Sequence, residues 1–236
     1  MYKLEMHLHT LGRSPCAKAD EKTIAKLYAD NGYNGIVCTN HYIRHLCEAY
    51  YRKGSPQANL QFWLDGYRTL KDKCAAYDID VFLGMELCID ELTYYKPTPP
   101  HAEMLLYGIT EEQLAADPYA LFGMTLRELH SVSVENGWIL AQSHPFRDGI
   151  DLCDPRLLEG AEFYNGHPTQ NNHNDQAQRF VRDNNLIATA GSDFHFVGAE
   201  GSGVYLQNAV HDNNQLVAEL RKRQHVPFCK DDTITV

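Results

Sequence analysis

Apolar and polar residues alternate along this chain in two patterns. Short, mostly apolar runs typical of strands covered on both faces recur, and segments with apolar residues at helical spacing separate them. The predicted strands are 2–10, 35–39, 79–83, 102–109, 138–143, 161–164 and 186–190. The predicted helices are 20–31, 59–77, a short one from Thr110, 125–136, 170–184 and 213–223.

Strand and helix alternate without a composition break or an internal linker, so we predict a single α/β domain over residues 1–236. Such alternation is typical of a parallel sheet that is closed, or nearly closed, into a barrel. A doubly wound open sheet is the alternative fold, but no glycine-rich fingerprint follows the first strand.

Two segments stand apart from this alternation. Residues 42–57 are aromatic and mixed in charge, and they are too long for a plain connector. We interpret them as an insertion near a functional site, of the kind that acts as a partial lid. Residues 90–100 contain three prolines and are predicted to form a loop or an irregular hairpin.

Composition narrows the classes of function. The content of 44% hydrophobic and 22% charged residues is ordinary for a globular protein. The net charge of -10 argues against a nucleic-acid groove. We find neither an apolar run of about 18 residues nor a secretory leader, so no membrane association and a cytoplasmic location are expected. The seven cysteines include no C-x-x-C pair and fit reduced thiols better than disulfides.

The first strand carries a candidate metal site. His7 and His9 are two residues apart, and side chains at that spacing point to the same face of a strand. Two imidazoles can therefore reach one metal ion. Because the chain contains twelve histidines, the pair alone is a weak signal.

Further candidate ligands follow the later strands, namely His41, Glu86, His144, Asp193 and His195. In an α/β barrel the carboxyl ends of the strands form the face where loops build active sites. Each residue has a plainer interpretation, because His144 before a proline could simply end a strand and Asp193 could cap a helix. Their joint occurrence at strand ends favours a metal centre.

Five motifs together resemble the PHP family, the polymerase and histidinol phosphatase superfamily of metal-dependent phosphoesterases. The motifs are His7-x-His9, Thr39-Asn40-His41, Gly84-x-Glu86, Ser143-His144-Pro145 and Gly191-Ser192-Asp193-Phe194-His195. The resemblance spans nearly the whole chain. It implies a distorted seven-stranded (β/α)7 barrel with two or three divalent metal ions, usually zinc, manganese or iron, at the carboxyl-terminal rim.

The resemblance also implies a set of ligands. The first metal would be held by His7, His9, Glu86 and Asp193, with Glu86 bridging to the second metal. His144 would bind the second metal together with a residue near the fourth strand. Glu103 is the preferred candidate for that position, and His101, two residues upstream, is the alternative.

A third metal would take His41 and His195, but here the chain departs from the family. The loop after the histidine pair usually provides an aspartate or a histidine, whereas Ser14-Pro15-Cys16 provides neither. The third site would then be absent, or completed by Cys16, Asp20 or water. Two metal ions are therefore a firmer expectation than three.

The ligand types indicate a mechanism. Paired divalent ions lower the pKa of a shared water and direct the bridging hydroxide at phosphorus. Arg147 is the candidate phosphate clamp, with Arg13 and Arg44 as weaker ones. If they do not ligate a metal, His41 or His195 could protonate the leaving oxygen.

We expect hydrolysis of a phosphate monoester of a small soluble substrate, in the manner of a histidinol phosphatase. A nuclease or nucleotide phosphatase with the same metals is the first alternative. A metal-binding member without turnover is the second. The sequence leaves the oligomeric state open.

Overall fold

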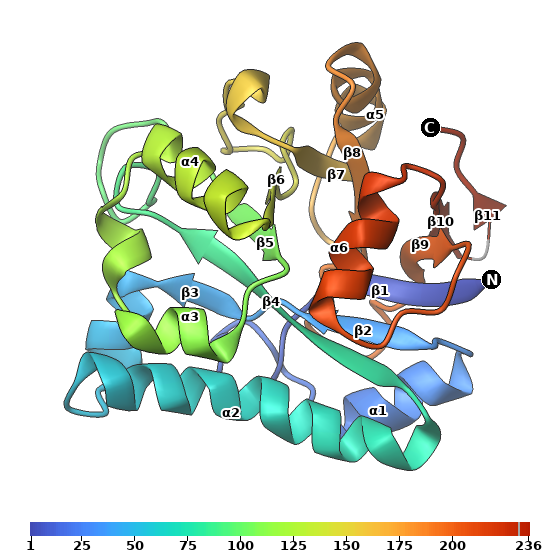
Figure 1. The fold of residues 1–236 in the computed structure, drawn as a ribbon, viewed down its shortest axis with the longest axis horizontal. Coiled ribbons are helices and arrows are strands. Elements are labelled where there is room, and N and C mark those ends of the chain that lie inside the picture. The colour runs from blue at the N-terminus through green and yellow to red at the C-terminus, as the bar shows by residue number, and fades with distance from the viewer. Residues whose placement is uncertain (231) are drawn as a thin grey trace.

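The computed structural model describes residues 1–230 and 232–236 (Figure 1). The strands are β1 (Tyr2–Leu8), β2 (Gly35–Cys38), β3 (His41–Ile43), β4 (Asp80–Cys88), β5 (Met104–Tyr107), β6 (Ile139–Gln142), β7 (Gly160–Asn165), β8 (Ile187–Gly191), β9 (Ser202–Leu206), β10 (Val226–Cys229) and β11 (Asp232–Thr233). The α-helices are α1 (Glu21–Asp30), α2 (Pro56–Cys74), α3 (Glu111–Ala116), α4 (Leu126–Asn136), α5 (Asn174–Asp183) and α6 (Asn213–Arg221).

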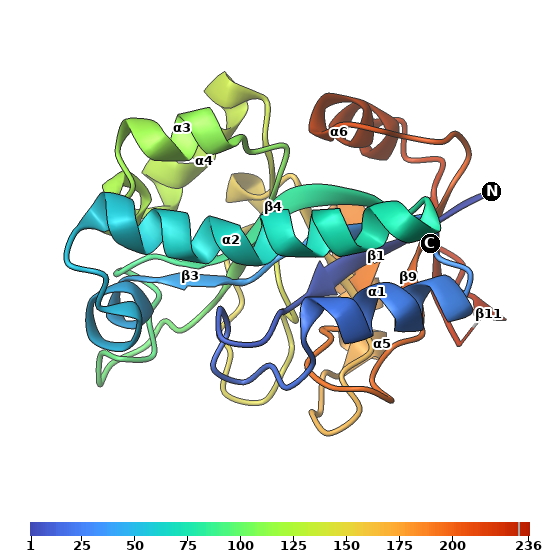
Figure 2. The ribbon, with the colours of Figure 1, turned by 90° about the horizontal axis from the view of Figure 1, so that it is seen from below.

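The strands form one mixed sheet in the order β11-β10-β9-β1-β2-β4-β5-β6-β7-β8, with β3 paired to β4. The sheet curls until β8 lies beside β1. The backbone N–H of Phe194 donates to the carbonyl of His7 at 3.0 Å, and the N–H of His9 donates to the carbonyl of Phe194 at 3.0 Å. These bonds join the carboxyl ends of β1 and β8. Helices cover the outside of the sheet, with α1 and α2 side by side (Figure 2).

The predicted α/β class is confirmed, and each predicted strand and helix has a counterpart within a few residues. The (β/α)7 barrel is not confirmed. Strand β5 is antiparallel to both β4 and β6, and β9 is antiparallel to β1. No helix separates β4 from β5 in the described chain, and a loop can reverse the chain direction where a parallel crossover would need a helix.

Four strands were not predicted, namely β3, β9, β10 and β11. Strand β3 occupies part of the segment 42–57, which also holds a π-helical stretch, Leu46–Tyr51. Strand β9 contains Gly203, where a Cβ atom would lie 2.1 Å from the carbonyl oxygen of Leu4. Only a glycine permits that approach of β9 to β1. Because glycine is otherwise depleted in strands, the sequence pattern did not indicate β9.

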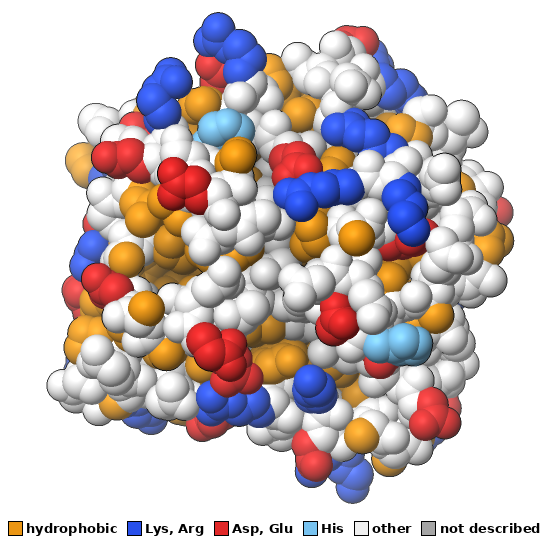
Figure 3. Space-filling model, in the orientation of Figure 1, with side chains coloured by type: hydrophobic (Ala, Val, Ile, Leu, Met, Phe, Trp, Pro, Cys, Tyr) orange, Lys and Arg blue, Asp and Glu red, His pale blue; other side chains and the backbone are white. Residues whose placement is uncertain are grey.

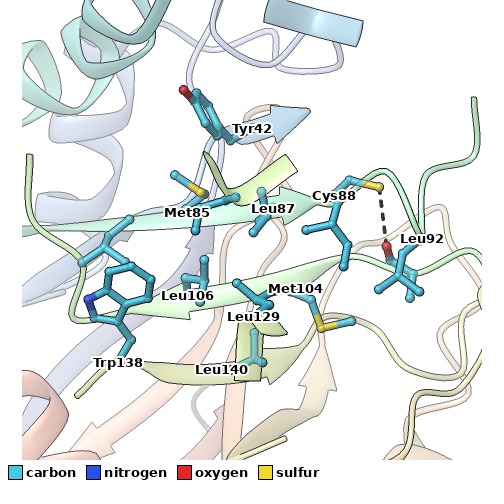
Figure 4. Packing of buried hydrophobic residues seen from close by; sticks show 14 of the residues in the cluster. Tyr42, Met85, Leu87, Cys88, Leu92, Met104, Leu106, Leu129, Trp138 and Leu140 are labelled. Carbon is cyan, nitrogen blue, oxygen red and sulfur yellow. Dashed lines mark hydrogen bonds between the residues drawn. The ribbon is translucent and has the colours of Figure 1, made fainter. Parts of the chain in front are cut away.

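The largest apolar core lies between β4, β5 and β6 and the helices that cover them (Figure 4). Met85 and Leu87 of β4 point into this core, where they meet Leu106 and Leu140 from the neighbouring strands. Side chains alternate across a strand, so Glu86 points to the opposite face, the concave side of the sheet. Among the described residues, none of the helices has both the length and the apolar character needed to cross a bilayer.

Candidate metal centre

Strand β1 delivers the predicted histidine pair to the concave side of the sheet. Leu4, Met6 and Leu8 are buried apolar residues of β1, and alternation sends His7 and His9 to the other face. Both histidines are fully buried. The Nε2 atom of His7 lies 3.2 Å from Oε1 of Glu86, and the Nε2 atom of His9 lies 3.3 Å from Oε2 of the same carboxylate.

Asp193 joins this group from the end of β8. Its Oδ1 atom lies 3.4 Å from Nε2 of His7 and 3.3 Å from Nε2 of His9. The hydrogen bonds that join β1 to β8 set this spacing, because they place Phe194 directly beside Leu8. The four residues assigned to the first metal therefore lie together.

Glu86 also faces a second group. The Nε2 atom of His144 lies 3.2 Å from Oε1 of Glu86 and 3.4 Å from Oε2 of Glu103. The Nδ1 atom of His41 lies 2.8 Å from Oε2 of Glu86 and 3.4 Å from Oε1 of Glu103. The unpredicted strand β3 accounts for this position of His41, because it pairs with β4 in a register that sets His41 opposite Glu86.

The alternative ligand His101 lies outside the cluster. Its Nδ1 atom is 3.1 Å from the carbonyl oxygen of Thr93, and its backbone N–H donates to Asp151. Glu103 directly precedes β5, whereas His101 lies further back in irregular chain, so strand alternation does not align the two residues. The structure brings Glu103 into the centre and leaves His101 in a loop.

His195 borders the centre on its other side. Its Nδ1 atom lies 2.7 Å from the carbonyl oxygen of Asp193, and its Nε2 atom lies 2.9 Å from Sγ of Cys16. The ring of His195 stacks on that of His9 at 4.5 Å between centroids. Asp20 is remote from this chemistry, since its carboxylate caps α1 by accepting from the N–H of Thr23.

Several ligand atoms of the cluster are buried without a hydrogen-bond partner among the described residues. They are His7 Nε2, His9 Nε2, His41 Nδ1, Glu86 Oε2 and Glu103 Oε1. The short distances between them lack hydrogen-bond geometry. Buried polar atoms without partners are costly, and a bound cation would satisfy them. Mixed imidazole and carboxylate ligands suit Zn²⁺, Mn²⁺ or Fe²⁺, so the residues fit divalent metal ions.

Opposite charges within the cluster stabilise the ionised forms of His7 and Glu86. Burial opposes ionisation of His7, but Asp193, Glu86 and Glu162 outweigh it and raise the pKa of His7 well above its usual value. Burial likewise disfavours charge on Glu86, yet His7 and His41 hold the pKa of Glu86 well below the ordinary range. Burial and then the neighbouring His41 and His195 lower the pKa of His9, so this imidazole is neutral.

Sequence reasoning missed two residues that orient the histidine pair. Glu162 Oε1 lies 2.9 Å from Nδ1 of His7, and Ser14 Oγ lies 2.9 Å from Nδ1 of His9. With each Nδ1 engaged, the Nε2 atom faces the centre, which is the arrangement that ligating histidines need. The available signal for Glu162 was a charged residue inside the otherwise apolar predicted strand 161–164.

A cavity of about 480 Å³ opens over the centre. Arg147 lines it, with Nη2 2.5 Å from Oδ2 of Asp193 and Nε donating to Asn172 at 2.8 Å. The other two arginines lie elsewhere. The guanidinium of Arg13 stacks over Phe62, and Arg44 pairs with Asp90.

Lys18 and His167, which the sequence did not single out, also line the cavity. They come from the loops after β1 and β7, which lie on the same side of the sheet (Figure 2). Burial lowers the pKa of His167 to about 4, so its ring is neutral near pH 7. Its Nδ1 atom accepts from the N–H of Thr169 at 3.4 Å, which leaves the ring proton on Nε2.

Known proteins resemble this chain in one sequence segment and in fold. A family described as PHP-associated matches residues 171–225. None of the curated proteins matches the sequence significantly.

Three solved structures share the fold. A two-domain protein from Bacteroides vulgatus, containing a predicted PHP-like metal-dependent phosphoesterase, aligns with a TM-score of 0.69 and 14% identity over 99% of this chain and 66% of its own. A protein from Bifidobacterium adolescentis, provisionally named a metal-dependent phosphoesterase, aligns with a TM-score of 0.53 and 13% identity over 94% of this chain and 96% of its own. An amidohydrolase from Chromobacterium violaceum, with bound sulfate and no metal, aligns with a TM-score of 0.58 and 14% identity over 98% of this chain and 99% of its own. At these identities the likeness shows the fold alone.

Proposed function

We propose that this chain, a member of the PHP superfamily, is a metal-dependent phosphoesterase that hydrolyses a phosphate monoester of a small soluble substrate. The observation that carries the proposal is the buried cluster around Glu86, whose ligand atoms lack partners among the described residues and whose members Glu86, Glu103 and Asp193 line the cavity. Two cations at the cavity edge, Arg147 and Lys18, complement a dianionic phosphate.

The residues divide the chemistry between them. Divalent ions, when bound, would lower the pKa of water and neutralise phosphate oxygens. His7, His9, Glu86 and Asp193 would hold one ion, and His144, Glu103 and the shared Glu86 would hold another. Arg147 keeps Asp193 in place and presents its guanidinium to the cavity.

His41 and His195 stay the candidate proton donors for the leaving oxygen. His195 uses Nδ1 and Nε2 in contacts with Asp193 and Cys16, and His41 faces the carboxylates of the centre. His167 is neutral, half-buried at the cavity edge and protonated on Nε2. Because a neutral imidazole is a very weak acid, His167 can donate a hydrogen bond to a phosphate or leaving oxygen but is not the source of its proton.

The size of the cavity favours a small substrate over a nucleic acid. The cavity volume of about 480 Å³ suits a small molecule. A nuclease is less favoured, because the net charge is -10. The face shown in Figure 3, which is the side of α6 and not that of the cavity loops, carries acidic and basic side chains interspersed.

The test uses protein that has been stripped of metal and reloaded with Mn²⁺, Zn²⁺ or Fe²⁺. p-Nitrophenyl phosphate, histidinol phosphate, nucleotides, short DNA and an N-acyl amino acid separate the phosphatase, nuclease and amidohydrolase readings. We expect turnover of at least one phosphate monoester. Amide hydrolysis alone would overturn the proposal, and failure of all substrates with every metal would favour a member without turnover.

Arg147→Lys sharpens the test. Lysine keeps the charge but loses the planar fork that binds two oxygen atoms. We expect KM for the phosphate ester to rise roughly 10- to 100-fold, because a charge-assisted hydrogen bond contributes about 1.5–3 kcal/mol. The control is Arg156→Lys, whose side chain is exposed and pairs locally with Asp154. Equal KM values in the two variants would contradict the role of Arg147.

A further inference from the structure

Cys16 differs from the other six cysteines in its exposure and in its contacts with histidines. The other thiols are buried in the core or, for Cys229, bonded to the hydroxyl of Tyr164. Cys16 is exposed, lines the cavity and lies with Sγ 2.9 Å from Nε2 of His195. His41 interacts with the same thiol and lines the same cavity.

Backbone bonds hold Cys16 at this place. The N–H of Ala17 donates to the carbonyl of Ser14 at 3.0 Å, which turns the loop. The N–H of Lys18 donates to the carbonyl of His195 at 2.7 Å, which ties the loop to the end of β8. The thiol is thus fixed over His195 by residues on both sides of it.

The other candidates for this position have different partners. Ser14 Oγ contacts Nδ1 of His9 and accepts from the N–H of His41 at 3.0 Å. Asp20 caps α1. Of the residues in this loop, Cys16 is the one whose ligand atom faces the histidines.

A second observation points to a ligand independently of the thiol. One nitrogen atom each of His9, His41 and His195 lies within 4.8 Å of the others, a spacing that fits one cation. The Nε2 atom of His9, which is assigned to the first ion, borders this group, and the Nδ1 atom of His41 is buried without a hydrogen-bond partner among the described residues. Cys16 Sγ closes this histidine group on the side of the cavity.

We propose that Cys16 is a thiolate ligand of a third cation, held together with His195 and His41, and that it makes this position select thiophilic ions. Tetrahedral zinc separates a sulfur and a nitrogen ligand by about 3.6 Å, so a shift of several tenths of an ångström admits the ion. The thiol proton leaves to solvent on binding. Thiolate ligands favour Zn²⁺ or Fe²⁺ over Mg²⁺ and Mn²⁺, which an aspartate would accept.

The proposal rests on the metal centre of the proposed function but not on turnover. Metal-free protein is therefore loaded with Co²⁺ and its near-ultraviolet spectrum recorded. The wild type should show a sulfur-to-cobalt charge-transfer band. Cys16→Ser should lack the band and bind about one zinc ion fewer per chain, whereas Cys229→Ser should retain both properties.

Cys16→Asp tests whether Cys16→Ser loses the ion because a ligand is missing or because the loop is disturbed. It should restore the ion count without the charge-transfer band, and shift the selectivity of the third position toward Mn²⁺. Zinc should also protect Cys16 from alkylation, as mapped by mass spectrometry.

A fully loaded wild type without the band, or a band that survives in Cys16→Ser, would overturn the proposal. Hydrolysis of phosphate esters by protein that lacks the band would refute ligation by Cys16 and leave the proposed function intact. A protein that shows the band but hydrolyses no phosphate ester would refute the proposed function and leave ligation by Cys16 intact.

Discussion

Replacing Glu162 by glutamine should weaken metal binding without removing any metal ligand. Glu162 is buried, and its Oε1 atom lies 2.9 Å from Nδ1 of His7. Its Oε2 atom accepts from the N–H of His144 at 2.7 Å and from Nδ2 of Asn165 at 2.9 Å. A carboxylate can accept all three bonds, whereas an amide offers one acceptor and one donor end.

Either orientation of the new amide has a cost. With the NH₂ group toward His7, the amide donates to Nδ1 and the ring proton moves to Nε2, where it blocks the ligand lone pair. With the oxygen toward His7, the NH₂ group meets two other donors. Loss of such a supporting partner lowers metal affinity about 10- to 100-fold. A buried donor left without an acceptor also costs about 1–3 kcal/mol of folding stability.

The assay is a competition titration with a chromogenic chelator, combined with ions counted per chain. The control is Glu159→Gln on the loop before β7, because Glu159 forms a surface ion pair with Arg221 at 2.7 Å. That pair contributes at most about 1 kcal/mol, so metal affinity should not change. Wild-type affinity in Glu162→Gln, or an equal loss in both variants, would refute this role of Glu162.

Three further predictions test the centre and its scaffold. Glu86→Gln and Asp193→Asn should each abolish turnover and reduce bound metal, and full activity in either would contradict the ligand assignment. Burial lowers the pKa of His225, so the unfolded chain binds more protons and stability falls as pH drops from about 6.5 through the lowered folded value. Urea unfolding of His225→Gln should lack that decline, and equal pH profiles would show the reasoning to be wrong. Gly191→Ala should cost about 2–4 kcal/mol in unfolding experiments, because the new Cβ would lie 2.5 Å from Cβ of His7. Its control is Gly123→Ala, where a Cβ meets nothing within 4 Å, and equal stability of the two variants would argue against close packing of β8 on β1.

The pattern of apolar and polar residues predicted the elements well but not their directions. Runs such as 35–39 and 186–190 are short, apolar and rich in β-branched or small residues, so strand formation is a local property. Whether two strands are parallel or antiparallel depends on the path of the chain between them. The barrel prediction was therefore wrong at β5 and at β9, where antiparallel strands replace the expected alternation.

The candidate ligands could be found from the sequence because they follow buried strands or alternate along one. His7 and His9 share a face by periodicity alone, and Glu86 points away from the core because Met85 and Leu87 point into it. Their motifs were enough to suggest the family, which the PHP-associated match over residues 171–225 supports.

Only the tertiary structure decided which residues complete the centre. The choice between Glu103 and His101 depended on the irregular chain before β5, which ties His101 to Thr93 and Asp151, and the support from Glu162 depended on β7 lying near β1. Cys16 and His195 are 179 positions apart, so no local pattern could pair them. Sequence periodicity sets the face of the strand on which a side chain lies. The distances between side chains of different strands are fixed only when the sheet curls and joins β1 to β8.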